Sequence, residues 1–268
     1  KLKHSIMSDS ISYTQLEDVI ENYVPIIKNS LIDRWNNWKI NLDEQIKFEV
    51  IGGILSRQVS LLIEFLGVVA IWNGNVGTII LRTMAENIII TAWILKKDTI
   101  KRCEMFVEHG LGQELLLLEK QKGEAQKRKL KEWEEEFLKH AEDFISRERN
   151  LHVLDVNIGA WANKNIRTMA EETELKDFYD FSFTPFSFSA HSTWNHILRY
   201  NLKESENPLN NYMKVPVINE IQPDIHFAEI AIKYLDMCYD IVDLAFNTKN
   251  DNDSLVESFF KELNKKNE

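Results

Sequence analysis

The sequence is poor in the residues that make tight turns, with 9 glycines and 5 prolines in 268 residues. So few turn formers exclude a β protein built of many short strands, and they favour long helices. Cysteine is also scarce: there are two, and neither belongs to a Cys-x-x-Cys pair or a Cys/His cluster of the kind that binds structural zinc. We therefore predict an all-α fold with no metal and no cofactor.

An excess of basic residues is absent as well. The net charge of −10 argues against a broad surface for DNA or anionic membranes, and it gives RNA binding no support, although a local basic pocket is compatible with it. The apolar segments 50–72 and 79–95 are interrupted by charged and amide side chains, so we expect core helices rather than membrane spans. No signal-peptide pattern is present, and we expect a cytoplasmic protein.

Apolar periodicity predicts a multi-helix bundle built on a buried antiparallel pair of helices, about 43–72 and 78–96. The clearest turn signal in the chain, Asn-Gly-Asn-Val-Gly at 73–77, connects the two. We expect a single helical domain over 1–268. It would comprise an N-terminal helical extension at 1–42, a core at 45–247 and a short C-terminal helix or tail at 248–268.

The second helix of this pair carries Arg82 and Glu86 among apolar neighbours. They are one helical turn apart and so share a face, and a charge on a buried helix needs a partner. Counted outward from the turn, Glu64 lies at a similar height and would place Arg82 between two carboxylates. Three interpretations follow: an ion network that fixes helix register, a site where Arg82 holds an anion while a carboxylate does acid–base work, or a charged surface at an interface.

Further candidate residues lie on predicted helices at 99–122 and 185–201. The first carries His109 on a polar face, and it lacks the Glu-x-x-His spacing of carboxylate-bridged metal sites. The second begins at Thr184-Pro185, a favoured helix start, and would place Ser187 and His191 on one face with Arg199 downstream. We select Arg82, Glu86 and His191 as candidate catalytic residues, and Glu64, Ser187, Arg199 and His109 as candidate binding residues.

Residues 119–150 are dominated by Lys, Glu and Arg. Their apolar residues recur at steps of three and four, which is typical of an amphipathic helix with a narrow seam: Leu130, Trp133, Phe137, Ala141 and Phe144. Such a seam suits a second copy of the chain, a partner protein or an edge of the core. At the end of this stretch, Arg147 and His152, separated by four residues, resemble the catalytic signature of HEPN ribonucleases, which cleave RNA without metal.

Several short motifs occur in a recognisable order. They are Leu81-Arg-Thr-Met-Ala-Glu86, the helix at 106–119, Ala170-Glu-Glu, Leu175-x-x-Phe-Tyr179, Ser187-x-x-x-His191 and Arg199-Tyr200. The set resembles a bacterial family of unknown function, numbered 5677, over residues 45–245. The resemblance implies an all-helical domain in which Arg82, Glu86 and His191 match polar signature positions. It also implies a role among accessory or effector proteins of bacterial stress and phage defence.

Three functions are consistent with these patterns. The first is a small pocket that handles an anion or a phosphoester through Arg82, a carboxylate and His191. The second is a non-enzymatic interaction or oligomerisation module that uses the seam at 130–144. The third is a HEPN-like ribonuclease centred on Arg147 and His152. The sequence leaves open whether the protein is an enzyme.

Overall fold

The computed structural model describes residues 13–128, 130–152, 162, 164–248 and 254–265. Its main helices are α1 (Tyr13–Asn37), α2 (Gln45–Leu66), α3 (Gly77–Lys96), α4 (Thr99–Ala125), α5 (Glu132–His152), α10 (Ile225–Phe246) and α11 (Leu255–Lys265). Shorter elements are η1 (Leu42–Glu44), η2 (Val69–Ile71), α6 (Ile166–Glu172), α7 (Lys176–Phe178), the π-helical turn η4 (Tyr179–Phe183), α8 (Thr184–Ala190) and α9 (Trp194–Tyr200). The predicted all-α bundle is confirmed; the described strands are one small antiparallel pair, β1 (Leu202–Glu204) and β2 (Lys214–Pro216).

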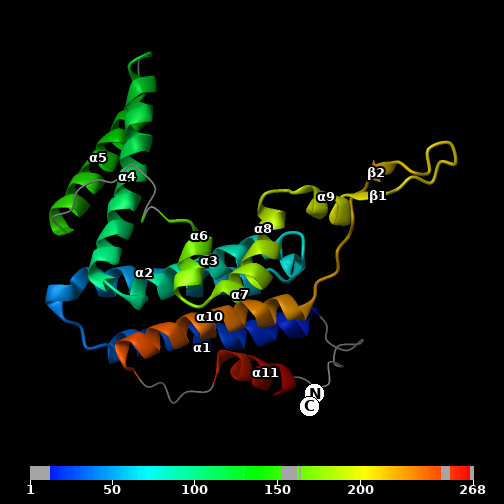
Figure 1. Ribbon diagram of the computed structural model, residues 1–268, viewed down its shortest axis with the longest axis horizontal. Helices are drawn as coiled ribbons and strands as arrows, with labels where there is room; N and C mark the ends of the chain where they lie inside the picture. Colours follow the sequence, from blue (N-terminus) through cyan, green and yellow to red (C-terminus); the bar gives the residue numbers. More distant parts are fainter. Residues whose placement is uncertain (1–12, 129, 153–161, 163, 249–253, 266–268) are drawn as a thin grey trace.

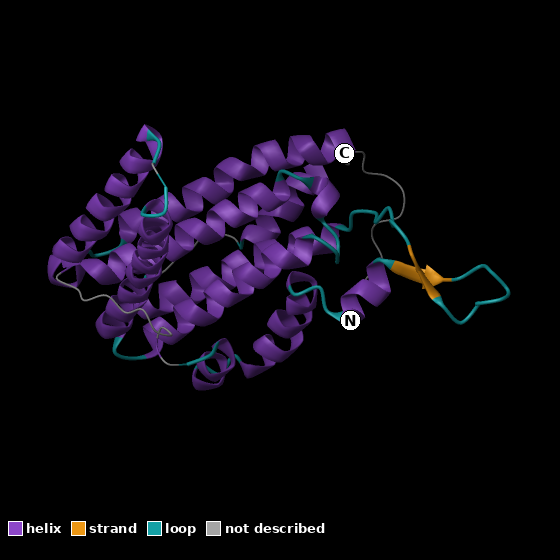
Figure 2. Ribbon diagram, turned by 90° about the horizontal axis from the view of Figure 1, so that it is seen from above, coloured by secondary structure: helices purple, strands orange, loops and turns teal. Residues whose placement is uncertain are grey.

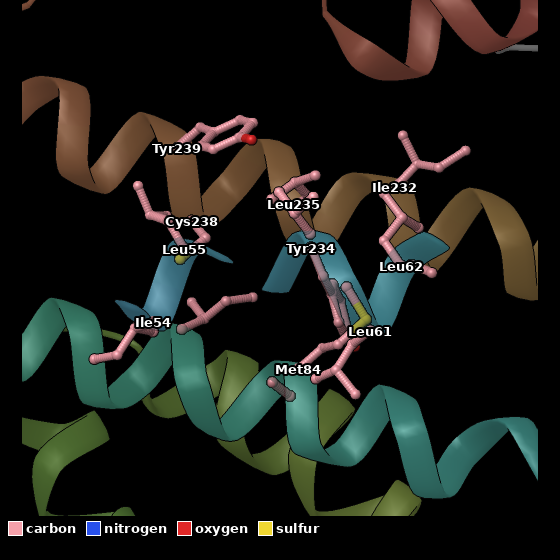
Figure 3. Close-up of a cluster of buried hydrophobic side chains, with 14 of the residues drawn as sticks. Ile54, Leu55, Leu61, Leu62, Met84, Ile232, Tyr234, Leu235, Cys238 and Tyr239 are labelled. Atoms are coloured by element: carbon pink, nitrogen blue, oxygen red, sulfur yellow. The ribbon is translucent and has the colours of Figure 1, made fainter. Parts of the chain in front are cut away.

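The centre of the bundle is formed by α2, α3 and α10, which pack side by side along the long axis of the molecule (Figure 1). Leu55 and Leu62 of α2 and Leu235 of α10 are fully buried in one cluster, together with Met84 of α3 (Figure 3). Burial of leucine-sized side chains stabilises the fold by about 1.5–3 kcal/mol each. The predicted pair of helices is therefore present, and α10 forms the third wall of its core.

The predicted register of this pair is wrong. The first helix was expected to continue to residue 72, but α2 ends at Leu66, and η2 with the buried Trp72 lengthens the connection to α3. As a result, the Gln58 amide lies at the level where Glu64 was expected: it donates to the Met84 carbonyl over 3.1 Å and accepts from Asn87 Nδ2 over 3.2 Å. Glu64 is exposed to solvent instead.

The two terminal helices cover the outer side of α10. Tyr23 of α1 is fully buried, and its hydroxyl donates to the Leu255 carbonyl over 2.6 Å. Asp236 of α10 caps α11, because its carboxylate accepts from Ser254 Oγ at 2.7 Å and from the backbone N–H of Leu255 at 3.1 Å. These bonds fix α11 against α1 and α10.

A second region, which we call the arm, consists of α5 and the part of α4 that packs along it. Figure 1 shows it projecting away from the bundle. The prediction of one helix over 119–150 is wrong, since α4 continues to Ala125 and the chain reverses before α5 begins at Glu132. The sequence hides this turn because residues 124–132 contain no glycine or proline.

The predicted helix over 185–201 is also interrupted. The structure has two short helices, α8 and α9, separated by a turn at which Ser192 adopts a left-handed φ of 46°. His191 caps the end of α8 rather than lying mid-helix. The segment after α9, predicted to be irregular, contains the β1–β2 hairpin, which extends from one end of the molecule (Figure 2).

By length and composition, Gly77–Lys96 is apolar enough to cross a membrane. In the structure this helix, α3, packs against α2, α6, α8 and α10, and half of its most apolar window is buried in those contacts. Such packing is that of a core helix.

Candidate functional site

The turn that precedes α3 is organised by one side chain. Asn73 donates from Nδ2 to the Ala70 carbonyl over 2.9 Å, and its Oδ1 accepts from the backbone N–H groups of Asn75 at 2.9 Å and Val76 at 3.0 Å. An asparagine that satisfies three backbone groups fixes a turn without help from regular structure. The Asn-Gly-Asn signal in the sequence therefore corresponds to a rigid turn.

Helix α9 packs directly on this turn. A Cβ added at Gly74 would lie 2.0 Å from the Tyr200 hydroxyl, so only glycine allows the tyrosine to approach this closely. One turn earlier on α9, the Nε2 of His196 lies 2.9 Å from Asn75 Oδ1. The His196 and Tyr200 rings also contact each other, with their centroids 4.8 Å apart.

A cavity of about 690 Å³ opens between this turn, α8, α9 and the start of α10. Its wall is largely apolar and includes Phe186, Phe188, Leu198 and Phe227, while polar groups come from Asn195, His196, Arg199 and Tyr200. Ligand pockets typically have this size and this composition, with apolar walls and a few convergent polar groups. Among the residues that the structure describes, Arg199 is the one charged residue that lines it.

Burial and the nearby positive charge of Arg199 lower the pKa of His196 from its ordinary value of 6.5. The imidazole is therefore neutral at neutral pH. With the Asn75 amide oriented as found, its oxygen can only accept, so Nε2 carries the proton and Nδ1 remains an acceptor. His196 was not among the predicted site residues; its one sequence signal was its position near Arg199.

The floor of the cavity is closed by hydroxyl groups that are bonded to each other. Thr78 Oγ1 lies 2.8 Å from Ser189 Oγ and 2.9 Å from the Gly74 carbonyl. Ser189 Oγ in turn donates to the Phe186 carbonyl over 2.8 Å. Both side chains are buried, and their hydrogen bond joins α3 to α8.

Arg82 and Glu86 form an ion pair of 2.7 Å within α3, and the guanidinium lies over the Phe183 ring at 4.8 Å. The pair is partly buried, with 22% of the Arg82 side chain exposed. The expected second carboxylate is absent from this pair, because Glu64 points into solvent. Arg82 Nε is buried and has no hydrogen-bond partner among the described residues. The charge of the guanidinium is balanced by the Glu86 carboxylate.

The structure does not bring Arg82 and His191 together. No hydrogen bond or ion pair joins them in the described part of the chain, and neither lines the cavity beside α9. His191 is exposed, and Ser187 donates to the Phe183 carbonyl over 2.8 Å rather than to the histidine. Of the predicted binding residues, Arg199 lines the cavity, while His109 lies partly buried on α4. The catalytic role of Arg82, Glu86 and His191 stays a prediction.

Among the described charged residues, Arg102, near the start of α4, is the most deeply buried, with 5% exposure, followed by Asp243 with 9%. Its guanidinium donates to the Trp93 carbonyl, lies 3.6 Å from the centroid of the Trp93 ring and approaches Glu172 of α6 at 3.9 Å. Glu172 also accepts from Trp93 Nε1 over 2.7 Å and from Lys164. Charges from several helices thus meet at Arg102 and not, as expected, at Arg82.

The residues of the predicted ribonuclease site, Arg147 and His152, lie on α5 of the arm. Arg147 of α5 is exposed and pairs with the neighbouring Glu148 at 3.1 Å, while the side chain of His152 lies outside the described residues. The ribonuclease prediction is therefore not tested.

Within the described residues, no group of three or more His, Cys, Asp or Glu side chains is arranged to hold a metal ion.

Comparison with known proteins gives one match. No curated protein and no solved structure matches the chain. Residues 48–208 match a family of unknown function, DUF5677, and this segment contains the 73–78 turn, Arg102, α8 and α9. Because the match covers more than half of the chain, the protein belongs to the DUF5677 family.

Proposed function

We propose that the protein binds a small anion, with a phosphoester as the preferred class, in the cavity beside α9. The observation that carries the proposal is Arg199, which is the one charged residue among the described residues that line this cavity, in a chain whose net charge is −10. Within the described part of the chain, no carboxylate lies within ion-pair distance of its guanidinium. A guanidinium without an internal partner is suited to hold a phosphate or carboxylate through two hydrogen bonds.

The apolar wall indicates what else the ligand carries. Phe186, Phe188 and Phe227 line the same cavity as Arg199. Aromatic side chains cover rings and aliphatic groups and prefer them to a hydrated ion. We therefore infer a ligand with an anionic group at one end and an apolar or aromatic body at the other.

His196 contributes hydrogen bonding that complements this charge. Because its pKa is lowered, it is neutral at neutral pH, and Nδ1 can accept a proton from a hydroxyl or amino group of the ligand. Such a neutral histidine is also the form that acts as a general base. Binding is the proposal; turnover of the bound phosphoester stays a prediction from the sequence.

Calorimetric titration of the whole protein tests the proposal. Inorganic phosphate, a nucleoside monophosphate and the matching nucleoside are titrated at equal ionic strength. Arg199→Gln should weaken binding of the two phosphate-bearing probes by about tenfold or more, the usual effect of removing a charge-assisted hydrogen bond. The monophosphate should bind more tightly than either of the other probes, because it occupies both ends of the cavity.

Arg57→Gln is the matched control, since Arg57 is an exposed arginine of α2 that does not line the cavity. Equal affinities for the two variants, or no binding of any probe to the wild-type protein, would overturn the proposal. The ribonuclease alternative is checked in parallel by an RNA-cleavage assay of His152→Ala and His191→Ala. Loss of cleavage in the first variant alone would favour a site at Arg147 and His152.

A further inference from the structure

The arm carries an aromatic row that the rest of the molecule leaves uncovered. Trp133, Phe137 and Phe144 of α5 have 62%, 53% and 45% of their surfaces exposed. The adjoining face of α5, which includes the buried Ile145, packs on α4, and α5 has no comparably extensive contact with any other described element. Helix α5 therefore has two apolar faces. One packs on α4, and the exposed row is the other.

The spacing of the residues in this row is the same in both directions along the chain. Leu130, Trp133, Phe137, Ala141 and Phe144 are separated by steps of three, four, four and three, so the row is symmetric about Phe137. In an antiparallel helix pair with a twofold axis at Phe137, this residue meets its own copy. Trp133 then lies opposite Ala141, which sets a large side chain against a small one, and Phe144 lies toward Leu130, just before the start of the other α5.

A shallow groove of about 450 Å³ lies where such a copy would be seated. It is lined by Trp133, Phe137 and Leu138 of α5, by Leu130 just before that helix, and by Gln121 and Ala125 of α4. In the antiparallel arrangement, Phe144 of a second copy lies at the level of Leu130 and can enter this groove. The groove thus provides the hole for an aromatic knob that the same helix supplies.

Charge also favours a second copy over other faces of the protein. Between positions 117 and 150, nine acidic and nine basic residues cancel, although the whole chain carries −10. Two copies that meet through their arms therefore bring neutral surfaces together, whereas other faces repel each other. On the flank of the row that faces away from α4, Glu136 lies about 3 Å along the axis from the level of His140 of the other copy, so each carboxylate has an imidazole nearby.

From these observations we infer that two copies of the protein associate through antiparallel contact of their α5 helices, centred on Phe137. The inference concerns a face away from the cavity beside α9 and does not depend on ligand binding. The aromatic rows are already partly covered, so the area they bury is at the low end for a specific interface. We expect a weak dimer whose population rises with protein concentration.

Sedimentation equilibrium of the whole protein over a range of concentrations is the first test. The apparent mass should rise from 31.5 kDa toward twice that value. Phe137→Glu should weaken association by about a hundredfold or more, because it places a buried charge opposite its own copy. Tyr212→Glu, at a 94% exposed aromatic in the β1–β2 loop, is the control and should leave association unchanged.

Disulfide crosslinking tests the antiparallel geometry. Cys103 and Cys238 are buried, so a single introduced cysteine reports on the contact alone. Phe137→Cys should crosslink on mild oxidation because the residue faces itself, whereas Trp133→Cys should not, since its two copies lie about 12 Å apart along the axis. Combining Trp133→Cys with Ala141→Cys should restore crosslinking.

Three outcomes would overturn the inference. The first is a mass that stays at 31.5 kDa at every concentration. The second is a dimer that Phe137→Glu does not weaken. The third is efficient crosslinking of the single variant Trp133→Cys, which would replace the antiparallel arrangement with a parallel one.

Discussion

In the bundle, Ile232, Leu235 and Tyr239 of α10 recur at three- and four-residue steps and are fully buried (Figure 3). On the arm, Trp133 and Phe137 of α5 are also four residues apart, yet more than half of each side chain is exposed. The spacing is of the same kind in both regions, and the number of neighbouring helices differs. Helix α10 packs extensively on α2, α3 and α11, whereas α5 has extensive contact with α4 only among the described elements.

This difference shows that apolar periodicity predicts a face that needs covering and does not say what covers it. In the bundle, the covering elements belong to the same chain, so each apolar contact adds to the stability of the folded protein. On the arm, the covering element proposed here belongs to a second copy, so its contribution depends on protein concentration. Variants at matched positions can separate the two cases.

The largest effect is expected for Leu62→Ala in the bundle. Leu62 is fully buried, and its truncation leaves a cavity, so the free energy of unfolding should fall by about 2–5 kcal/mol. Phe137→Ala on the arm, measured at a concentration where the protein is monomeric, should change it by about 0.5 kcal/mol or less. Urea unfolding followed by circular dichroism measures both; equal losses would contradict the comparison.

Charged residues extend the comparison to the base of the arm, where Arg102 of α4 joins α3 and α6. Arg102→Met removes the donor to the Trp93 carbonyl and one of the two cations beside Glu172, and should lower the free energy of unfolding by about 1–3 kcal/mol. Arg82→Met is the control, because Arg82 also lies over an aromatic ring but is more exposed and has its partner on its own helix. A larger loss for Arg82→Met would assign the structural role to the pair in α3.

Two glycines allow a position with a close neighbour to be compared with a position that has free space around it. Gly74→Ala would press on the Tyr200 hydroxyl, and we expect a loss of about 1 kcal/mol as the ring moves, together with weaker phosphate binding. At Gly53 of α2, an added Cβ meets nothing within 4 Å, so Gly53→Ala should stabilise the helix by about 0.5–1 kcal/mol. Thermal unfolding distinguishes the two, and a stabilising Gly74→Ala would show that Tyr200 does not need this contact.

The smallest effect concerns pH. The pKa of His196 in the folded protein is lowered, chiefly by burial and secondarily by Arg199, so the unfolded chain binds more protons in the interval below 6.5. The stability that depends on neutral His196 is present above pH 6.5 and is lost as the pH falls through the folded-state pKa. In Arg199→Gln the pKa measured by NMR titration should rise while staying below 6.5, and in Arg57→Gln it should not move. A fall in the first variant would contradict the assigned cause.

The sequence predicted the helical class, the antiparallel pair and the turn at 73–77 because apolar spacing and turn chemistry are local. It did not predict the register of that pair, since the end of α2 at Leu66 depends on how Trp72 is buried between helices. The same limit applies to Arg102. Its position on α4 resembles that of the exposed lysines around it, and only packing against Trp93 shows that it is buried.

The cavity beside α9 was partly predictable. Arg199 was a candidate binding residue, and the Asn-Gly-Asn turn was predicted. The histidine selected from the sequence was His191, whereas the histidine that lines the cavity is His196. A continuous helix at 185–201 would have favoured His191. The left-handed Ser192 breaks that helix and turns α9 so that His196 faces Asn75. The sequence around Ser192 contains no glycine or proline that would predict this break.

The third wall of the core, α10, lies beyond the segment that matches the family, which ends at residue 208. A fragment cut to those limits would keep α2 and α3 but lose the helix that covers Leu55, Leu62 and Met84 (Figure 3). The segment that matches the family is therefore shorter than the part of the chain that must fold together. Expression of the family segment alone should yield aggregated material, because the surface that α10 covers would be left facing water.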